Sequence, residues 1–486
     1  MEKNRTYTEI DYAEKSLHHP QIDELSQLSI PMIFKQVVAR RGEAIALRQG
    51  DRLITYKELD RLSDLVARWI VAQGLTGKTV GVSMPRCPEV VITLYGLMKA
   101  GAIYVPIDEG HPKERLRFMA KDARIAGWIT AQPIPDVLDF IPNWVFQDIL
   151  TEAAAYTDRT LPVISPSQYA YILFTSGTTG QPKGVIIRHN QVVVMAWNTE
   201  VNAFQLHEEA RFLSFASLNF GASIGEMFGA TLIGAQLVIA TEQDKQDPEA
   251  LVALLERAAV TYMLIPPAYL AYCPYRELPA LHTIVVAGEA PQAEVINKWQ
   301  QTKRIVNAYG CTEDTVHAVC GVLTPDCSTN NVGYPIQGIS CYLLNEQLQP
   351  TPLGEIGELY IGGHQLTDGY FNRPELNQAK FIDNPFVSPE DKAKGFNTRL
   401  FKTGDLMQRT ADGRLLFIGR SDFQIKINGI RIEAGEIEAV LKQCTQVKQA
   451  IVTAQTHKER KLLVAYVQCE TPETLDIAEV YMVLRA

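Results

Sequence analysis

Apolar runs and helical patterns alternate along the first three hundred residues and predict strands and helices in turn. Residues 79–84 form a short apolar run typical of a buried strand, residues 88–100 carry a helical pattern, and residues 103–108 form a second run. A strand, a helix and a strand at this spacing predict a parallel pair joined by a crossover helix, in a sheet with covered faces. Similar patterns predict strands at residues 127–130, 211–217, 235–240, 262–265 and 283–287, and helices at residues 30–41, 115–122, 191–202, 219–232 and 248–259.

The pattern changes from residue 340 onward. Short strands with glycine turns predict a smaller, more antiparallel part. A polar stretch at residues 419–422 precedes a hairpin, a helix at residues 433–442 and two further strands. We therefore expect an α/β protein with a large core of mixed and parallel sheets between helices and a β-rich subdomain, over residues 1–420. A small, incomplete α+β domain is expected over residues 421–486. Residues 132–168 contain five prolines and are expected to be loop-rich.

Composition narrows the class of protein. A chain of 486 residues is too long for one compact core, and 46% apolar with 21% charged residues is ordinary for a globular protein. The net charge of −9 argues against a nucleic-acid partner. The eight cysteines form no C-x-x-C pair, which argues against zinc and favours a reducing compartment. With no signal-peptide core and no uninterrupted membrane span, we expect a cytoplasmic protein without a membrane partner.

A glycine-rich loop at residues 174–184 lies between two apolar runs, which predicts strand, loop and strand. Its three glycines let backbone N–H groups approach an anion, and hydroxyl groups and one lysine add further donors. The spacing is not that of a P-loop, because Pro182 separates Gly180 from Lys183. An ordinary turn between strands is the alternative. As a phosphate-holding loop, it makes candidates of Thr175, Ser176, Thr178, Thr179 and Lys183.

Several stretches of this chain resemble, in the expected order, the motifs of the adenylate-forming superfamily. This superfamily contains acyl-CoA synthetases, luciferases and the adenylation domains of nonribosomal peptide synthetases. The ending RIEAGEIE favours the adenylation domains. The stretch GELYIGGHQLTDGYF is expected to have a structural role only. The matching stretches are ITYKEL (54–59), MKAGAIYVPID (98–108), TSGTTGQPKG (175–184), NAYGCTE (307–313), GELYIGGHQLTDGYF (357–371), FKTGDL (401–406) and GRSDFQIKINGIRIEAGEIE (419–438).

The resemblance implies an enzyme that uses Mg·ATP to convert a carboxylic acid into an acyl-adenylate. A small mobile domain then turns, and the phosphopantetheine thiol of a carrier domain takes the acyl group. Cys311 stands where the superfamily usually has proline. We interpret this change as tolerated, with a reactive thiol as the alternative. The implied roles are nucleotide binding by Asn307, Ala308, Tyr309 and Gly310, phosphate binding by Thr312, Mg²⁺ ligation by Glu313, ribose contacts by Asp405 and Arg420, a hinge at Asp422, and a loop around Gly429 that enters the site for the second half-reaction.

The predicted acid pocket lacks one expected charge. The superfamily's F-D-x-S aspartate, which pairs with the α-ammonium of an amino acid, aligns with Gly221. An unpaired buried ammonium costs about 3–5 kcal/mol, or roughly two to four decades in selectivity. Small apolar neighbours suit an aryl or phenylpropanoid acid, with 2-oxo and 2-hydroxy acids as alternatives, while Gly221, Gly225 and Gly229 also suit close helix packing. The pocket positions are Phe220, Gly221, Ala222, Gly225, Leu264, Val285, Ala287, Gly288, Ala308, Val316 and His317.

Three further expectations concern the chain as a whole. The superfamily places a lysine near the end of the small domain, and this chain stops at Ala486 before that motif, so we expect its adenylation step to be impaired. The start at Met1 without a condensation domain suggests a loading module. The alternative hypotheses are a free-standing acyl-CoA synthetase and, ranked last, a nonenzymatic ATP-binding scaffold.

Overall fold

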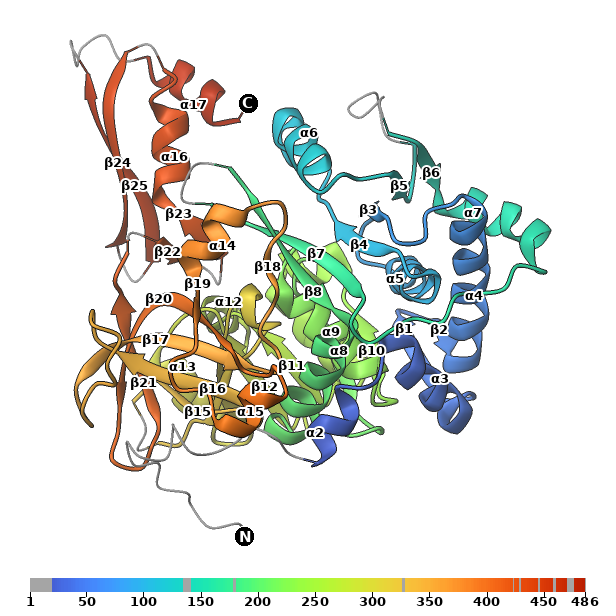
Figure 1. Cartoon of the computed structure of the whole chain (residues 1–486), viewed down its shortest axis with the longest axis horizontal. Coiled ribbons are helices and arrows are strands. Elements are labelled where there is room, and N and C mark those ends of the chain that lie inside the picture. The colour runs from blue at the N-terminus through green and yellow to red at the C-terminus, as the bar shows by residue number, and fades with distance from the viewer. Residues whose placement is uncertain are drawn as a thin grey trace.

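The structure is a computed structural model, and the residues that it describes are 20–133, 141–177, 181–325, 328–422, 424–427, 430–444, 446–457, 460–469 and 476–485. Figure 1 shows a body of sheets and helices, followed by a C-terminal part that stands apart at its upper left. The predicted α/β class is therefore confirmed.

One sheet is built around the predicted strand–helix–strand unit. The central strand β3, Thr79–Ser83, pairs in parallel with β4, Ile103–Pro106, and with β5, Gly127–Thr130. On the far side of β4 come the hairpin strands β7, Tyr169–Thr175, and β8, Lys183–Arg188. The strand order is β18-β8-β7-β4-β3-β5-β6, so the glycine-rich loop joins the second and third strands of a mixed sheet.

The crossover helix α5, Pro88–Ala100, is buried along almost its whole length. A helix that is apolar all round is expected in a protein core. Its buried Lys99 is paired with Asp60 and Asp64 of α4, Tyr56–Ala72, at 2.6 and 2.7 Å. Such pairing is what a buried ammonium requires. The chain reverses at the end of α5 through Gly101, whose φ of 70° is favourable for glycine.

A second, longer sheet follows along the chain. Its parallel strands lie in the order β13-β12-β11-β9-β10, with helices α9, Gly221–Thr231, and α11, Pro248–Arg257, between them in sequence. The predicted alternation is confirmed here. The strand bounds are β9 Arg211–Ser214, β10 Gln236–Ile239, β11 Tyr262–Ile265, β12 Thr283–Ala287 and β13 Arg304–Tyr309.

The β-rich part is antiparallel as expected, but it is not a separate sheet. Except for β18, which pairs with β8 of the first sheet, its strands continue the long sheet, because β21 pairs with β15, which pairs with β14 and so with β13. The order at this end is β16-β17-β20-β21-β15-β14. The strand bounds are β14 Val319–Val322, β15 Asn331–Pro335, β16 Ile339–Leu344, β17 Ile356–Gly363, β18 Gly369–Tyr370, β19 Phe381–Asp383, β20 Arg399–Arg409 and β21 Leu415–Arg420.

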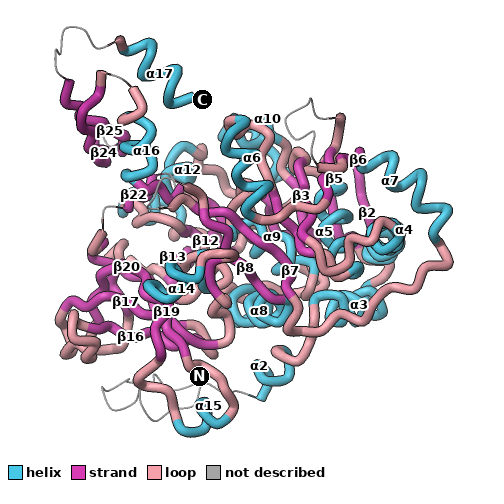
Figure 2. The backbone as a smooth tube through the Cα atoms, turned by 45° about the horizontal axis from the view of Figure 1, so that its top comes forward, coloured by secondary structure: helices cyan, strands magenta, loops and turns pink. Residues whose placement is uncertain are grey.

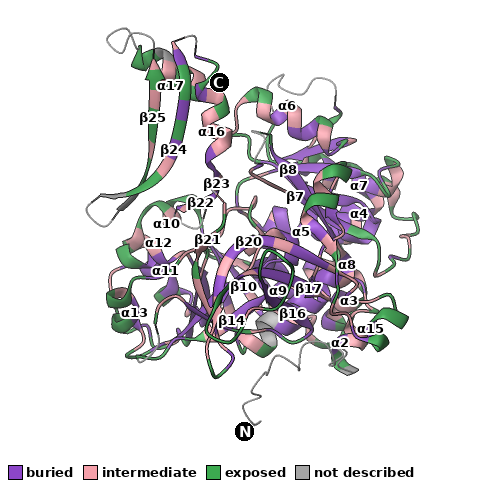
Figure 3. Ribbon diagram, turned by 60° about the vertical axis from the view of Figure 1, so that its left-hand side comes forward, coloured by how far each residue is buried: buried purple, intermediate pink, exposed green. Residues whose placement is uncertain are grey.

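The C-terminal part has a hydrophobic cluster of its own, built on Leu441, Val447 and Val452 among others. Figure 2 shows it projecting from the body, and Figure 3 shows that its long hairpin carries many exposed residues. An ion pair joins it to the body, between Arg115 of α6 and Glu436 of α16. Its elements are β22 Gln424–Ile427, β23 Ile430–Glu433, α16 Ala434–Leu441, β24 Val447–His457, β25 Arg460–Cys469 and α17 Ile477–Arg485, while α6 spans Lys113–Asp122.

Two stretches differ from the sequence prediction. Residues 132–168 were expected to be loop-rich, yet β6, Asn143–Val145, extends the first sheet and α7, Phe146–Ala153, packs on α4. Both elements are held by Trp69 of α4. Its ring packs edge-on against Trp144 with centroids 4.9 Å apart, and its indole N–H donates to Glu152. The predicted helix at residues 191–202 divides into α8, His189–Met195, and a wider π-helical segment.

The remaining elements support these layers. Helix α3, Ile30–Arg41, has the bounds that its pattern predicted. The hydroxyl of Thr55 accepts a hydrogen bond from the Glu58 backbone N–H and so caps the start of α4. Across the described residues, no helix is both long and apolar enough to cross a membrane. The other bounds are β1 Ile45–Gln49, β2 Arg52–Thr55, α2 Pro20–Leu25, α10 Glu242–Gln246, α12 Pro267–Tyr272, α13 Ala293–Trp299, α14 Pro374–Lys380 and α15 Pro389–Ala393.

Candidate active site

The glycine-rich loop joins β7 to β8, which pair antiparallel with Thr175 opposite Lys183. The predicted strand, loop and strand are confirmed, and β8 rather than a helix follows the loop. The buried hydroxyl of Thr175 makes no hydrogen bond within the part of the chain that the structure describes. A phosphate oxygen would satisfy this group. Ser176 begins the loop, whereas Thr178 and Thr179 lie outside the described residues.

Lys183 and Glu313, predicted from separate motifs, meet in the interior. The Lys183 ammonium lies 3.7 Å from Oε1 of Glu313, and both side chains are buried. Between them stands Tyr370 of β18, whose hydroxyl donates to the same Oε1 at 2.6 Å and accepts from Lys183 at 3.1 Å. The sequence did not single out Tyr370, because it lies in the stretch expected to have structural content only.

Two neighbouring carboxyl groups in the turn Thr312–Asp314 have different surroundings. Glu313 faces Lys183 and Tyr370, so its charge is matched. Neither carboxyl oxygen of Asp314 makes a hydrogen bond to a described residue, and burial raises the pKa of Asp314 well above its usual range. Of the two, Glu313 is therefore suited to hold Mg²⁺, which prefers charged oxygen ligands and phosphates.

The backbone after this turn is strained. Thr315 and Val316 have φ values of 46° and 88°, a left-handed conformation that β-branched residues rarely adopt. The hydroxyl of Thr315 donates to the Gln365 carbonyl, and the Gln365 amide donates to the His317 carbonyl at 2.8 Å. A Cβ on Gly310 would lie 2.2 Å from the Val316 carbonyl oxygen, so only glycine fits there. These contacts fix the positions of Val316 and His317, two residues of the predicted acid pocket.

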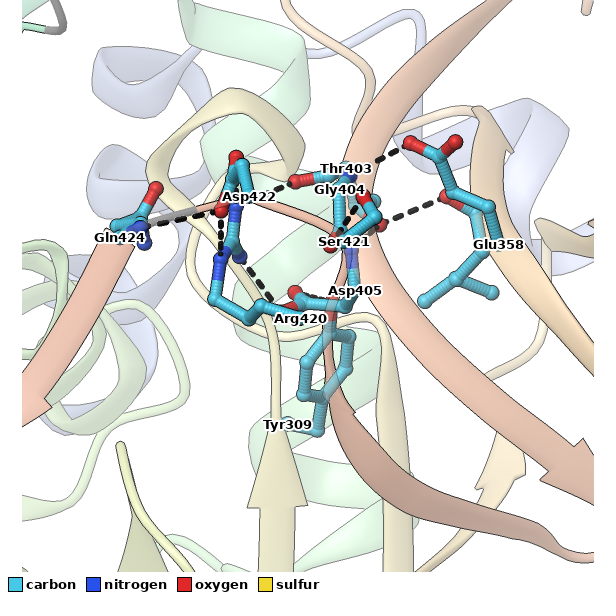
Figure 4. Close-up of polar contacts among 10 residues, drawn as sticks. Tyr309, Glu358, Thr403, Gly404, Asp405, Arg420, Ser421, Asp422 and Gln424 are labelled. Carbon is cyan, nitrogen blue, oxygen red and sulfur yellow. Dashed lines mark hydrogen bonds and ion pairs between the residues drawn. The ribbon is translucent and has the colours of Figure 1, made fainter.

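The predicted nucleotide residues gather where Tyr309, at the end of β13, meets Asp405 of β20 and Arg420 of β21 (Figure 4). The Tyr309 hydroxyl donates to Oδ2 of Asp405, and Nη1 of Arg420 donates to Oδ1 at 2.6 Å. Burial, followed by the charge of Asp405, raises the pKa of Tyr309 well above its usual range. Asn307 differs from the others, because its amide donates to the backbone carbonyl of Asn331 at 2.8 Å.

Asp422 lies directly beside the Arg420 guanidinium, at the start of the C-terminal part (Figure 4). A Cβ on Gly404 would lie 2.7 Å from Nη2 of Arg420 and 2.8 Å from Asp422, so the glycine of the T-G-D stretch lets this pair approach the backbone. Gly429, predicted to belong to a loop of the second half-reaction, lies outside the described residues.

Four of the predicted acid-pocket residues lie toward the carboxyl ends of three neighbouring parallel strands. Leu264 of β11 pairs with Val285 of β12, and Ala287 pairs with Ala308 of β13. Ligands of open α/β sheets bind at such ends. Gly288 follows β12 with a φ of 93°, where the chain turns away.

Helix α9 closes this region from another side. Gly221 begins the helix, Phe220 precedes it, and Ala222 and Gly225 follow within the first turns. A Cβ on Gly221 would lie 3.7 Å from Cγ2 of Val316, an ordinary contact distance. The structure therefore brings these two predicted pocket positions together.

His317 is the titratable member of the predicted pocket. It is buried, its ring meets Phe204 edge-on at 5.5 Å, and its Nε2 makes no hydrogen bond to any described residue. Burial lowers the pKa of His317 to about 4, so the ring is neutral near pH 7.

These groups fit ATP and Mg²⁺. At the predicted phosphate end lie a threonine hydroxyl with no hydrogen-bond partner among the described residues, a buried lysine and a buried carboxylate. A second carboxylate and an arginine lie beside an aromatic ring at the other end. Mg²⁺ commonly takes one or two carboxylates and completes its shell with substrate phosphates and water.

The sequence profile of the AMP-binding enzymes matches residues 34–371. One protein of the linear gramicidin synthase of Brevibacillus parabrevis is 35% identical over 491 residues, which cover 100% of this chain and 6% of that protein. Novobiocin biosynthesis protein H of Streptomyces niveus is 35% identical over 450 residues, covering 90% of this chain and 73% of that protein. The chain thus spans under a tenth of the length of the gramicidin synthase protein.

Among solved structures, NpsA-ThdA, an artificially fused adenylation–PCP di-domain from Klebsiella oxytoca, superposes with a TM-score of 0.82 at 25% identity, covering 94% of this chain and 91% of that one. The N-terminal subdomain of NpsA in complex with 3-hydroxybenzoyl-AMSN gives a TM-score of 0.71 at 26% identity, covering 81% and 100%. These relationships confirm the prediction that the chain is an enzyme that uses ATP and Mg²⁺. The chain belongs to the family of AMP-binding enzymes, among the adenylation domains of the nonribosomal peptide synthetase type.

Proposed function

We propose that this chain activates a carboxylic acid that lacks an α-amino group, as an acyl-adenylate, and passes the acyl group to a carrier-domain thiol. The meeting of Lys183 and Glu313 carries the adenylation half of this proposal. These side chains come from separate motifs, and together they provide a cation for the phosphates and a carboxylate for Mg²⁺. Adenylation brings negative charges together, so positioning and electrostatic stabilisation supply most of the catalysis.

We assign the nucleotide roles residue by residue. Thr175, Ser176 and Lys183, with Thr178 and Thr179 of the same loop and Thr312 of the neighbouring turn, bind the phosphates. Glu313 binds Mg²⁺. Tyr309 supplies a ring for the adenine beside Asn307, Ala308 and Gly310, Asp405 and Arg420 bind the ribose, and Asp422 is the hinge. The hydrogen bonds that already order Asp405 and Arg420 support the ribose assignment, because a preorganised carboxylate can accept from both ribose hydroxyls.

Gly221 is the main argument that the activated acid lacks an α-amino group. No carboxylate stands at this position, so the α-ammonium of an amino acid would find no partner there. The other pocket positions are small or apolar, and the neutral His317 does not supply a negative charge. The solved NpsA subdomain with 3-hydroxybenzoyl-AMSN supports an aryl acid as the first choice.

The Nε2 of His317 makes no hydrogen bond within the described part of the chain, and this favours a second candidate class. A 2-oxo or 2-hydroxy acid carries an oxygen beside the carboxylate that this nitrogen could meet. A buried polar atom without a partner is costly, and a substrate oxygen would remove that cost.

The acceptor is proposed from the relatives. Gramicidin synthase is a peptide synthetase, and NpsA-ThdA joins an adenylation domain to a PCP, so a phosphopantetheine thiol on a carrier domain is the proposed acceptor. An acyl-CoA synthetase would instead release its product to free CoA. Parallel transfer assays with a carrier protein and with CoA separate these two enzymes.

ATP–pyrophosphate exchange with matched acids tests the proposal. Phenylalanine, 3-phenylpropanoate, cinnamate, phenylpyruvate and phenyllactate differ mainly at the α and β carbons. We expect exchange with one or more of the amino-free acids at least a hundredfold above phenylalanine, consistent with the lost pair. Calorimetric titration with the corresponding acyl-sulfamoyl adenosines adds a readout that needs no turnover. Preference for phenylalanine would contradict the substrate assignment, and absence of both exchange and analogue binding would favour the nonenzymatic scaffold.

A further inference from the structure

Tyr370 joins the phosphate hairpin to the turn that carries Glu313. It lies in the short strand β18, where it pairs with Val185 of β8. Its hydroxyl accepts a hydrogen bond from the Lys183 ammonium at 3.1 Å and donates one to Oε1 of Glu313 at 2.6 Å. A tyrosine hydroxyl can donate and accept at once, so one oxygen connects a cation to an anion.

The direct contact between the two charges is longer than either contact with Tyr370. Lys183 and Glu313 are 3.7 Å apart, which is within ion-pair range but beyond ordinary hydrogen-bond length. The ammonium also lies 4.5 Å from the centroid of the Tyr370 ring. All three side chains are at most 5% exposed, so their contacts are little weakened by solvent.

The backbone of Tyr370 is held on both sides. Its N–H donates to the Asn377 side chain at 2.7 Å, and its carbonyl accepts from the same side chain at 2.9 Å. Three residues earlier, the Thr367 N–H donates to the Glu313 carbonyl at 3.0 Å. The ring of Phe381 packs against Tyr370 with centroids 5.8 Å apart. The hydroxyl position is thus determined by several independent contacts.

We infer that Tyr370 is a positioning residue that holds the Glu313 carboxylate for the metal and the Lys183 ammonium for the phosphates. This inference rests on the proposed function. The hydroxyl stands between the two charges and stops them from closing a direct pair that would occupy both. Without it, Glu313 and Lys183 would move together, and the metal would lose an oriented ligand. Loss of the hydroxyl is therefore expected to weaken binding of the metal-bound nucleotide, which uses both side chains, more than binding of the nucleotide alone.

The test is calorimetric binding of the non-hydrolysable analogue α,β-methylene-ATP, with and without Mg²⁺, to the wild-type chain and to Tyr370→Phe. The phenylalanine keeps the ring and removes only the hydroxyl. We expect the affinity measured without Mg²⁺ to fall less than the affinity measured with Mg²⁺, because only the metal-bound nucleotide also loses the contact with Glu313. Hydrogen bonds to charged groups correspond to about a ten- to hundredfold change in affinity, so the gain produced by Mg²⁺ should fall by that factor.

The matched control is Tyr95→Phe. Tyr95 is also buried and its hydroxyl is hydrogen-bonded, to Thr231 at 2.6 Å, but it lies on α5 away from the proposed site. Its removal should lower the melting temperature to a similar degree and leave the Mg²⁺ gain unchanged. Equal losses of affinity with and without Mg²⁺ in Tyr370→Phe would overturn the inference, as would an unchanged Mg²⁺ gain.

A second variant covers the case in which Tyr370→Phe does not fold. Asn377→Ala keeps the Tyr370 hydroxyl and removes both side-chain hydrogen bonds to its backbone. A partial loss of the Mg²⁺ gain supports the inference, and a full wild-type gain contradicts it. If nucleotide binding by the wild-type chain does not respond to Mg²⁺ at all, the proposed function fails and the inference fails with it.

Discussion

The Arg420 guanidinium donates two hydrogen bonds to the Asp422 carboxylate in a bidentate arrangement, Nε to Oδ1 at 2.6 Å and Nη2 to Oδ2 at 2.7 Å. The same guanidinium donates through Nη1 to Asp405. Burial acts to raise the pKa of Asp422, but the bonds from Arg420 outweigh it and lower that pKa. The proposed ribose arginine and the proposed hinge aspartate therefore form one hydrogen-bonded unit, and we predict that this unit couples nucleotide binding to the C-terminal part.

Replacing Arg420 by lysine should weaken this unit without removing its charge. An ammonium cannot reproduce the planar fork toward two carboxylates. We expect the Kd for AMP, measured by calorimetry, to rise by about ten- to hundredfold, the range for hydrogen bonds to charged groups. The control is Arg414→Lys, because Arg414 is more exposed and pairs with Asp412 on the surface. Similar effects of the two substitutions would contradict the role of Arg420.

Gly221→Asp should convert the acid preference. A Cβ at this position has ordinary contact distances, so an aspartate side chain can enter. We expect the ratio of exchange rates for phenylalanine over 3-phenylpropanoate to rise by about two to four decades, since the ammonium gains a buried partner. Gly221→Asn has nearly the same shape without the charge and should leave the ratio within tenfold of wild type. A shift of equal size in both variants would show that shape rather than charge sets the preference.

Acid should destabilise the fold through His317. Its pKa of about 4 in the folded chain lies below the ordinary value of 6.5, so the unfolded chain binds the proton more readily. The stabilisation from the neutral ring is complete above pH 6.5 and is lost as the pH falls toward 4. At pH 5 the loss is about 2 kcal/mol, which His317→Gln should remove. Urea unfolding at pH 7 and pH 5 measures it, with the exposed His282 replaced by glutamine as control. Identical acid losses in the wild type and His317→Gln would refute the assignment.

The ion pair between Arg115 and Glu436 should hold the C-terminal part against the body. Both side chains are largely shielded from solvent. In Arg115→Ala we expect amide hydrogen exchange in α16 to speed up by about three- to tenfold, matching a pair of about 1 kcal/mol. Arg117→Ala is the control, because Arg117 lies on the same helix and pairs locally with Glu114. The double exchange Arg115→Glu with Glu436→Arg should restore slow exchange, and faster exchange there would argue against a direct pair.

Much of the fold was predictable because its signals are local. The helix at residues 30–41, the fully apolar α5 and the short buried strands follow from periodicity within a dozen residues. The strand, loop and strand around the glycine-rich loop follow from its composition in the same way. The prediction of loops at residues 132–168 was partly wrong. Its prolines obscure the periodicity of short elements, and these elements are stabilised by distant residues such as Trp69.

The candidate site also combines features that local motifs predict with contacts that depend on packing. The motifs identified residue types suited to binding phosphate, metal, ribose and an acid, and they showed that position 221 carries no carboxylate. The packing of the folded chain brings Lys183 to Glu313 with Tyr370 between them, and it joins Asp405 to Asp422 through Arg420. Local patterns report propensity and solvent exposure, whereas these contacts join segments distant in the chain, whose approach depends on how whole sheets pack.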